Sequence, residues 1–401
     1  MTASPARVGA ADVRTPTRAI VALSFAACGS AAALRVCDPL LPRLTEQYGI
    51  GLGAAAQTVT AFAIAYGVLQ LAYGPIGDRY GKYRVITFAC AASAVTSIAC
   101  ALAPAFGTLV VARVFAGATA GALIPLSLAW IGDAVPYERR QPVLARFLLG
   151  QMFGLALGQL VGGLGADYWG AGPSFIVLAV WFAGSTVLLW RSAAHAPRAA
   201  PRPSSGSIVA RFGAVLGVRW ARFLLACIFL EGVFLFGAIA FIPTHFNRAY
   251  GVPLTLAGSM VMLYGAGGMV FAALSGVLVR TLGEPGLAAA GGSLLLLSLA
   301  TISLVHTVPV GAVACLTAGL GFYMLHNTLQ VNATQMAPAQ RGSGVALFAA
   351  CLFLGQSTGV GLAGLASERF GTAPVILLGG VLVLALALVF ATARRRALAR
   401  S

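Results

Sequence analysis

The fold of this chain is decided by the stretch Gly74-Pro75-Ile76-Gly77-Asp78-Arg79-Tyr80-Gly81-Lys82-Tyr83-Arg84, a short charged turn between two apolar segments. Residues 54–76 lead into it and residues 84–103 lead away from it. Each segment is long enough to cross a bilayer as a helix, which takes ~20 apolar residues. Glycine permits the backbone conformations that a tight turn requires. The stretch therefore predicts a hairpin of two transmembrane helices.

The same alternation of apolar segments and polar turns continues over the whole chain. Hydrophobic residues make up 59% of the 401 residues and charged residues only 9%, whereas soluble proteins carry roughly 25% charged residues. The segments are continuously apolar, unlike the short alternating strands of a β-barrel. We expect an all-α membrane protein with twelve transmembrane helices, at residues 19–41, 54–76, 84–103, 107–132, 142–166, 173–191, 221–243, 255–281, 286–305, 308–335, 343–366 and 373–393.

The basic residues predict the orientation of the chain. With a cytoplasmic N-terminus, 21 of the 26 Lys and Arg residues fall on the cytoplasmic side, three fall on the other side, and Arg35 and Arg113 fall within spans. Lys and Arg are enriched in cytoplasmic loops of membrane proteins. We therefore expect a multi-pass protein of a bacterial inner membrane with both termini cytoplasmic. The net charge of +16 follows the loops and forms no stripe on a soluble face, which argues against nucleic-acid binding.

The chain divides near its middle. Residues 192–210 are rich in Pro, Arg and Ser and contain no long apolar run, as is typical of a flexible linker. We expect an N-terminal six-helix bundle over residues 1–191, a cytoplasmic linker over residues 192–220 and a C-terminal six-helix bundle over residues 221–401.

The two halves resemble each other in sequence. Residues 140–163 can be laid over residues 341–364 at a constant offset of 201, with Arg, Phe and Gly residues in register. Equivalent helices then run in the same direction, which makes a parallel repeat. Such duplication is typical of transporters whose substrate site lies between the halves near the bilayer midplane.

The charged turn resembles the signature loop of the major facilitator superfamily, Gly-x-x-x-Asp-Arg-x-Gly-Arg/Lys. Its defined positions are occupied by Gly74, Asp78, Arg79, Gly81 and Lys82. The resemblance implies the major facilitator fold, with two pseudo-symmetric six-helix halves, and secondary active transport of a small molecule by alternating access. It also implies a conformational latch, in which the Asp78 carboxylate caps the positive N-terminal end of the eleventh helix in the outward-facing state.

Span five carries a glycine motif, Gly154-x-x-x-Gly158-Gln159-x-x-Gly162-Gly163. It is similar to the motif of the twelve-helix proton-coupled drug antiporters, Gly-x-x-x-Gly-Pro-x-x-Gly-Gly, with Gln159 in place of the proline. The resemblance implies proton-coupled efflux. The substitution at Gln159 favours an alternative, the proton-coupled uptake of an organic solute or anion. Small residues at this spacing permit close helix packing, and we expect them to bring helices of opposite halves together.

Charged residues within the spans are candidates for proton coupling, because charge in the hydrocarbon is costly. Arg35 and Asp38 lie three residues apart and share a helical face. We expect Asp38 to load and release a proton while Arg35 tunes its pKa; the alternative is a structural ion pair at the outer interface. Pro39 and Pro42 are expected to end or kink this helix.

Arg113 and Glu231 are the other charged candidates. Arg113 lies in Leu109-x-x-x-Arg113-x-x-x-Gly117-x-x-x-Gly121, which resembles the fourth-helix motif of the superfamily and implies a part in proton coupling, facing the cavity. Glu231 lies midway along span seven. We expect it to take up a proton or contact the substrate; the alternative is an interhelical hydrogen bond.

Polar residues in otherwise apolar spans are candidates for lining a substrate cavity. His326, Asn327 and Gln330 share one face of span ten, and a histidine titrates near neutral pH. Their alternative role is hydrogen bonding between packed helices. The remaining candidates are Gln70, Tyr264 and Gln356.

No phosphate-binding loop, metal-ligand spacing or nucleophile–base arrangement is evident in the sequence. We therefore expect a transporter and not an enzyme, with no cofactor and no bound metal. Its expected partners are a small-molecule substrate, protons and the lipid bilayer, and we expect a monomer. A non-transporting membrane sensor is a further alternative.

Overall fold

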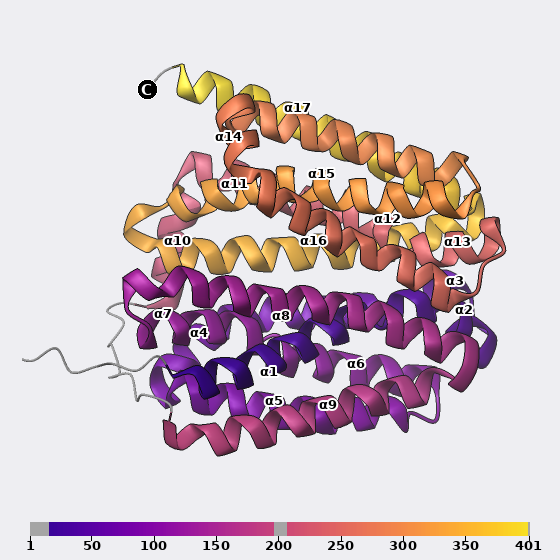
Figure 1. Ribbon diagram of the computed structural model, residues 1–401, viewed down its shortest axis with the longest axis horizontal. Helices are drawn as coiled ribbons and strands as arrows, with labels where there is room; N and C mark the ends of the chain where they lie inside the picture. Colours follow the sequence, from indigo (N-terminus) through magenta and orange to yellow (C-terminus); the bar gives the residue numbers. More distant parts are fainter. Residues whose placement is uncertain (1–15, 196–206, 400–401) are drawn as a thin grey trace, which may run out of the picture.

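The computed structural model describes residues 16–195 and 207–399, which form long helices that run along one common direction (Figure 1). Residues 16–195, the N-half, comprise α1 (Thr17–Arg35), α2 (Cys37–Tyr48), α3 (Leu52–Ala55), α4 (Gln57–Tyr80), α5 (Lys82–Ala101), α6 (Phe106–Ala120), α7 (Leu123–Ala134), α8 (Tyr137–Leu164), η1 (Gly165–Trp169), α9 (Ala171–Ser192) and η2 (Ala193–His195). Residues 207–399, the C-half, comprise α10 (Ile208–Gly217), α11 (Arg219–Glu231), η3 (Gly232–Phe236), α12 (Gly237–Ile239), α13 (Ile242–Tyr250), α14 (Leu254–Leu304), α15 (Val308–Gln335), η4 (Pro338–Gln340), α16 (Arg341–Phe370) and α17 (Thr372–Leu398).

The described residues contain 11 helical segments long and apolar enough to cross a membrane. One of them, α14, has 51 residues and is really two helices, because Gly283 interrupts it with φ 62° and ψ 174°. Glycine tolerates this positive φ, which other residues rarely adopt. The interruption raises the count to twelve crossings and confirms the predicted all-α, twelve-helix fold.

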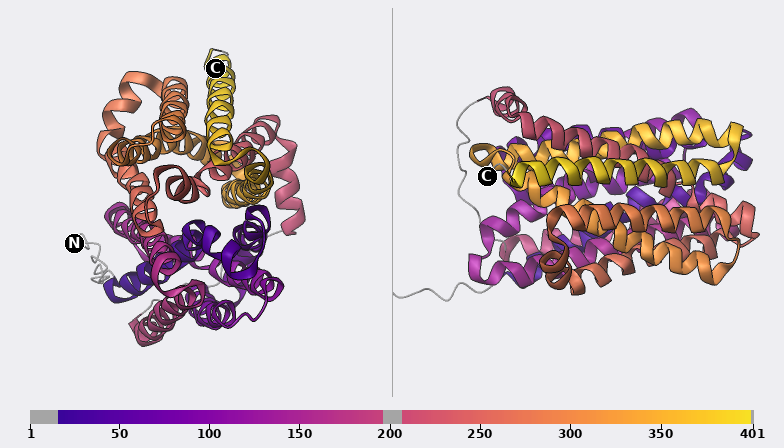
Figure 2. Two further views of the ribbon diagram at one scale, coloured as in Figure 1. Left: turned by 90° about the vertical axis from the view of Figure 1, so that its right-hand side faces the viewer. Right: turned by 90° about the horizontal axis from the view of Figure 1, so that it is seen from above.

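The two halves lie side by side, with the N-half in indigo to magenta and the C-half in pink to yellow (Figures 1 and 2). Both described ends of the chain lie at one end of the bundle, here called the proximal end, together with α10. The opposite, distal end holds α2, α3 and α13. Of the expected linker, residues 196–206 lie outside the described residues, and the helical segment α10 precedes α11.

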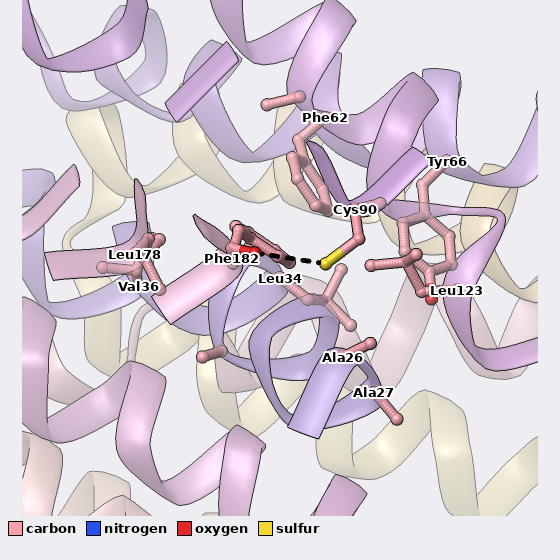
Figure 3. Close-up of a cluster of buried hydrophobic side chains, with 14 of the residues drawn as sticks. Ala26, Ala27, Leu34, Val36, Phe62, Tyr66, Cys90, Leu123, Leu178 and Phe182 are labelled. Carbon is pink, nitrogen blue, oxygen red and sulfur yellow. Dashed lines mark hydrogen bonds between the residues drawn. The ribbon is translucent and has the colours of Figure 1, made fainter. Parts of the chain in front are cut away.

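One hydrophobic core is centred on each half, and the core centred on the N-half also takes in Ala240, Phe241, Val360 and Ala363 of the C-half. The C-half core is built from C-half residues alone. The N-half core, part of which Figure 3 shows, packs the rings of Phe62, Tyr66 and Phe182 around α1 and α4. Within it the Cys90 thiol donates a hydrogen bond to the carbonyl oxygen of Phe182, at 3.4 Å. This buried apolar packing fixes the helices on which the polar side chains are mounted.

The first helix of each half is irregular beside its carboxylate. In the N-half, α1 ends at Arg35 and α2 begins at Cys37. Pro39 explains the break, because proline has no N–H to donate to the Arg35 carbonyl and its ring collides with that group. In the C-half, the π-helix η3 directly follows Glu231, and such π-turns are frequent at functional sites.

The internal sequence repeat is matched by equivalent glycine contacts between the first and fifth helices of each half. A Cβ atom at Gly154 would collide with the carbonyl oxygen of Cys28, and one at Gly355 with that of Phe229. Both members of the second contact lie 201 positions after those of the first. Glycine therefore lets the fifth helix of each half press against the first helix of the same half.

These contacts correct an expectation about span five. Gly154, Gly158 and Gly162 face α1 or the start of α2, within the N-half. The prediction that they join helices of opposite halves is wrong for these three residues. It holds for Gly163, whose Cβ would lie 2.7 Å from the carbonyl oxygen of Leu254 in the C-half. The glycines of α8 face α1 because these two helices pack directly against each other within the N-half.

Candidate functional site

A buried polar cluster lies where α1 gives way to α2. The Asp38 side chain is fully buried, and its Oδ2 accepts hydrogen bonds from Arg35 Nη1 at 3.4 Å and from Gln159 Nε2 at 3.2 Å. Asp38 Oδ1 and Gln159 Oε1 have no hydrogen-bond partner among the described residues. The cluster therefore holds two acceptor atoms free for a proton or a ligand.

Gln159 was expected only as a deviation from a packing motif. The structure gives it a second role, because its amide reaches the carboxylate of Asp38. Proline at this position would have no such donor. The signal in the sequence was a polar side chain that replaces the motif's apolar ring.

A small cavity adjoins this cluster, between the two halves. Its volume of about 40 Å³ is close to that of one water molecule. The lining residues are Arg35, Leu155, Ala156 and Gln159 from the N-half and Ile239, Val261, Met262, Tyr264 and Gly265 from the C-half. Arg35 also crosses the interface, because its guanidinium carbon lies 4.7 Å from the centre of the Phe236 ring. An organic molecule could occupy this place only if the halves moved apart.

Tyr264 brings a further polar atom to the cavity. Its hydroxyl is buried and has no hydrogen-bond partner in the described part of the chain. Tyr264 and Gln159 face the cavity from opposite halves. Together with Arg35 they can offer hydrogen bonds to one guest from both sides.

Arg113 does not line this cavity, contrary to expectation. The side chain is 1% exposed and lies inside the N-half. It donates hydrogen bonds to the carbonyl oxygens of Thr58, at 3.0 Å, and Ala33, at 3.1 Å, and its guanidinium carbon lies 4.1 Å from the centre of the Phe62 ring. Ala33 belongs to the last turn of α1, where carbonyl groups lack helical partners. Arg113 therefore joins the end of α1 to the start of α4 by hydrogen bonds to their backbone carbonyls.

The C-half holds a second buried pair, formed by Glu231 and His326. Glu231 Oε2 lies 2.8 Å from His326 Nδ1. The Glu231 side chain is fully buried, that of His326 is 14% exposed, and Glu231 Oε1 has no partner among the described residues. The sequence singled out each residue separately, but only the fold brings α11 and α15 close enough to pair them.

The other predicted cavity residues are spread over several environments. Gln356 is 1% exposed with an unpartnered Nε2, and Gln70 has an unpartnered, buried Oε1. Asn327 is half-buried and Gln330 is exposed. None of these four residues belongs to the lining of the described cavity.

The charged turn at residues 74–84 forms its ion pairs with residues of the N-half. Lys82 Nζ lies 3.0 Å from Asp78 Oδ1 and 2.7 Å from Asp133 Oδ2. Among the described residues no ion pair or hydrogen bond is seen between Asp78 and α16, the eleventh helix, whose N-cap residue Gln340 makes no side-chain cap of its own. The latch contact that the resemblance implies for Asp78 is therefore not made in this structure. Gly81, with φ 91°, forms the turn itself, and Arg79 lies over the ring of Tyr80.

These features agree with a comparison against known protein families. The sequence profile of the Major Facilitator Superfamily matches residues 23–360. The chain belongs to the Major Facilitator Superfamily. It is therefore a multi-pass membrane protein of a transporter family.

Relatives of this superfamily member include the MFS-type transporter YceJ of Bacillus subtilis (strain 168). The two sequences are 25% identical over 343 residues, which cover 83% of this chain and 86% of YceJ. The multidrug efflux pump LfrA of Mycolicibacterium smegmatis (strain ATCC 700084 / mc(2)155) is 30% identical over 213 residues, 52% of this chain and 42% of LfrA. Among solved structures, the POT family transporter PepTSo superposes with a TM-score of 0.77 over 96% of this chain and 99% of that one, at 14% identity. That likeness confirms the major facilitator fold.

Proposed function

We propose that this transporter exports small, partly apolar molecules across a bacterial inner membrane in exchange for protons, with both termini in the cytoplasm. The observation that carries the proposal is the Asp38–Arg35–Gln159 cluster beside a cavity that both halves line. The Asp38 carboxylate is hydrogen-bonded to Arg35 and Gln159, which line the cavity. It could therefore release and take up a proton as the two halves move relative to each other. The efflux pump LfrA supports the proposed direction.

The coupling would act through the charge of Asp38. When Asp38 is ionised, it neutralises Arg35, and both charges are accommodated in the buried cluster. A proton on Asp38 would remove this counter-charge and leave Arg35 free to reach toward the interface between the halves. Protonation would thus move a side chain that lines the cavity. The substrate would then bind the two access states with different affinity, as alternating access requires.

The Glu231–His326 pair is the proposed second proton-binding group. Glu231 ends α11 and directly precedes the π-helix η3, much as Asp38 lies beside the break between α1 and α2, and His326 reaches it from α15. An imidazole and a carboxylate at hydrogen-bonding distance can hold one proton between them.

One observation favours a second candidate function, the uptake of an organic anion with a proton. Arg35 lines the cavity, and the residues lining it include no Asp or Glu. An anion could replace ionised Asp38 as the partner of Arg35 if Asp38 took up a proton at the same time. Anion and proton would then move together and not in exchange.

Flux measurements in reconstituted vesicles with an imposed pH gradient test the proposal. Dyes, antibiotics and organic acids serve as probes. Antiport predicts that probe moves against the proton flow, and symport predicts movement with it. We expect Asp38→Asn to abolish flux driven by the pH gradient while probe-for-probe exchange continues.

Glu46→Gln is the matched control. Arg43 and Glu46 form another pair three residues apart in α2, also at 3.4 Å, but on the exposed surface. We expect this variant to keep gradient-driven flux. If Asp38→Asn retained gradient-driven flux as well, Asp38 would not be the coupling group.

A further inference from the structure

The start of α14 is capped by a carboxylate from the other half. Asp167, in η1 of the N-half, accepts hydrogen bonds from the backbone N–H of Leu254, at 3.0 Å on Oδ1, and of Thr255, at 2.6 Å on Oδ2. The first N–H groups of a helix have no helical acceptor and carry partial positive charge. Asp167 therefore joins the two halves by a charge-assisted contact at the distal end.

A second carboxylate caps the N-half in return. Glu368, near the end of α16 in the C-half, accepts a hydrogen bond at 2.6 Å on Oε1 from the backbone N–H of Gly53. Gly53 lies at the start of the continuous helical span Leu52–Tyr80 that α3 and α4 form. The acceptor and the donor again belong to opposite halves.

The two contacts are related by the internal repeat. Asp167 and Glu368 lie 201 positions apart, and so do Gly53 and Leu254. In each contact a carboxylate at the distal end of a fifth helix caps the second helix of the other half. A chance surface contact would not be expected to recur at the offset that relates the two halves.

Small residues let the helices approach beside each cap. A Cβ atom at Gly163 would lie 2.7 Å from the Leu254 carbonyl oxygen, and one at Gly364 would lie 3.0 Å from the Cα atom of Gly53. Gly163 and Gly364 also lie 201 positions apart. The glycines bring the helix ends together, and the carboxylates complete the contact.

We propose that Asp167 and Glu368 form a paired clasp that holds the distal end of the transporter closed and must release in every cycle. Alternating access requires the halves to separate at this end, and separation breaks all three of these hydrogen bonds. Both carboxylates are exposed, so water can replace them as partners when the clasp opens. The clasp thus sets the balance between the two access states without touching the substrate. The clasp would act in the same way whichever substrate is moved and whether or not protons are coupled.

Distance measurements across the distal end test the clasp. Spin labels at Ala105 and Thr307, on exposed distal loops of opposite halves, report the separation by double electron–electron resonance in lipid nanodiscs. Cys351 is replaced by alanine first, because the other native cysteines are buried. We expect Asp167→Ala and Glu368→Ala each to raise the ratio of distal-open to distal-closed molecules about threefold to tenfold. The double variant is expected to raise it further.

Glu46→Ala provides the control, because Glu46 is an exposed carboxylate at the same end whose ion pair stays within the N-half. It should leave the distance distribution unchanged. Distributions of Asp167→Ala and Glu368→Ala that match the parent protein, in samples with the parent's thermal stability, would overturn the clasp. Asp167→Glu keeps the charge and should return the distribution toward the closed state. Because the readout is a distance, loss of the clasp and loss of the proposed proton coupling are separate results.

Discussion

At the scale of single residues, burial divides the charged side chains into two kinds. Arg113 donates hydrogen bonds to two backbone carbonyls inside one half. Asp38 and Glu231 each keep one oxygen without a partner among the described residues. A buried carboxylate oxygen without a hydrogen-bond partner can still accept a proton or a ligand. A buried group whose hydrogen bonds go to the backbone supports the fold.

Arg113 is therefore predicted to stabilise the fold and not to couple protons. Arg113→Met would remove two buried, charge-assisted hydrogen bonds to carbonyl oxygens, at a cost of about 2–4 kcal/mol. We expect a lower thermal unfolding temperature in detergent. The pH profile of residual flux should match that of the parent protein, and a shifted profile would instead assign Arg113 to coupling.

Glu231 and His326, whose side chains lie 2.8 Å apart, are predicted to bind one proton between them. Glu231→Gln and His326→Gln should each flatten the pH dependence of flux, and the double variant should add little to either single change because the two groups share one proton. Flux measured from pH 5 to pH 9 checks this. Thr328→Val, a change of another buried side chain on α15, is the control. Independent, additive effects of the two substitutions would contradict a shared proton.

At the scale of elements, the first and fifth helices of each half form the rigid unit on which the candidate site is mounted. Their backbones approach closely because glycines face carbonyl oxygens, at Gly154 and Gly158 in α8 and at Gly355 and Gly359 in α16. The break after α1 and the π-helix after α11 place irregular backbone beside each carboxylate. Close packing thus fixes the helices, and local irregularity frees polar groups at the site.

Replacing a glycine at one of these contacts by alanine, which adds one methyl group, is predicted to destabilise the protein. A Cβ atom at Gly355 would collide with the backbone carbonyl oxygen of Phe229 in α11, and a backbone atom cannot give way as a flexible side chain can. We expect Gly355→Ala to destabilise the protein by about 1–3 kcal/mol, as overpacking does, and to lower its thermal unfolding temperature.

Gly184→Ala is the control for this prediction. A Cβ atom at Gly184, inside α9, would meet nothing within 4 Å, and alanine forms helices more readily than glycine. No loss of stability is expected there. Equal losses at the two positions would mean that the packing contact is not the cause.

At the scale of the whole molecule, the two ends of the bundle differ. Carboxylates cap helices across the interface at the distal end. At the proximal end Asp78 remains with Lys82, and in the described part of the chain it makes no contact with the N-terminus of α16. A transporter that alternates between two states would exchange one set of caps for the other.

Substitutions at the two ends are therefore predicted to oppose each other. Asp167→Ala should favour the distal-open state, in which Asp78 is expected to engage α16. Adding Asp78→Asn should then lower the ratio of distal-open to distal-closed molecules by about threefold. The same pair of spin labels measures this effect. An Asp78→Asn change that opened the distal end further would contradict the exchange of caps.

The sequence by itself determined the fold class and the repeat, because long apolar segments can satisfy their backbone hydrogen bonds in a membrane only as helices. It also predicted the Arg35–Asp38 contact, since residues three apart in helical backbone are neighbours and Val36 keeps helical dihedral angles between α1 and α2. The tertiary structure alone decided that Gln159 reaches Asp38, that Glu231 meets His326, and that Arg113 is sealed inside one half. These partners lie on different helices, and which faces meet depends on packing between segments 80 to 121 residues apart. Helical periodicity fixes neighbours along one helix but leaves the rotation of each helix against the others open.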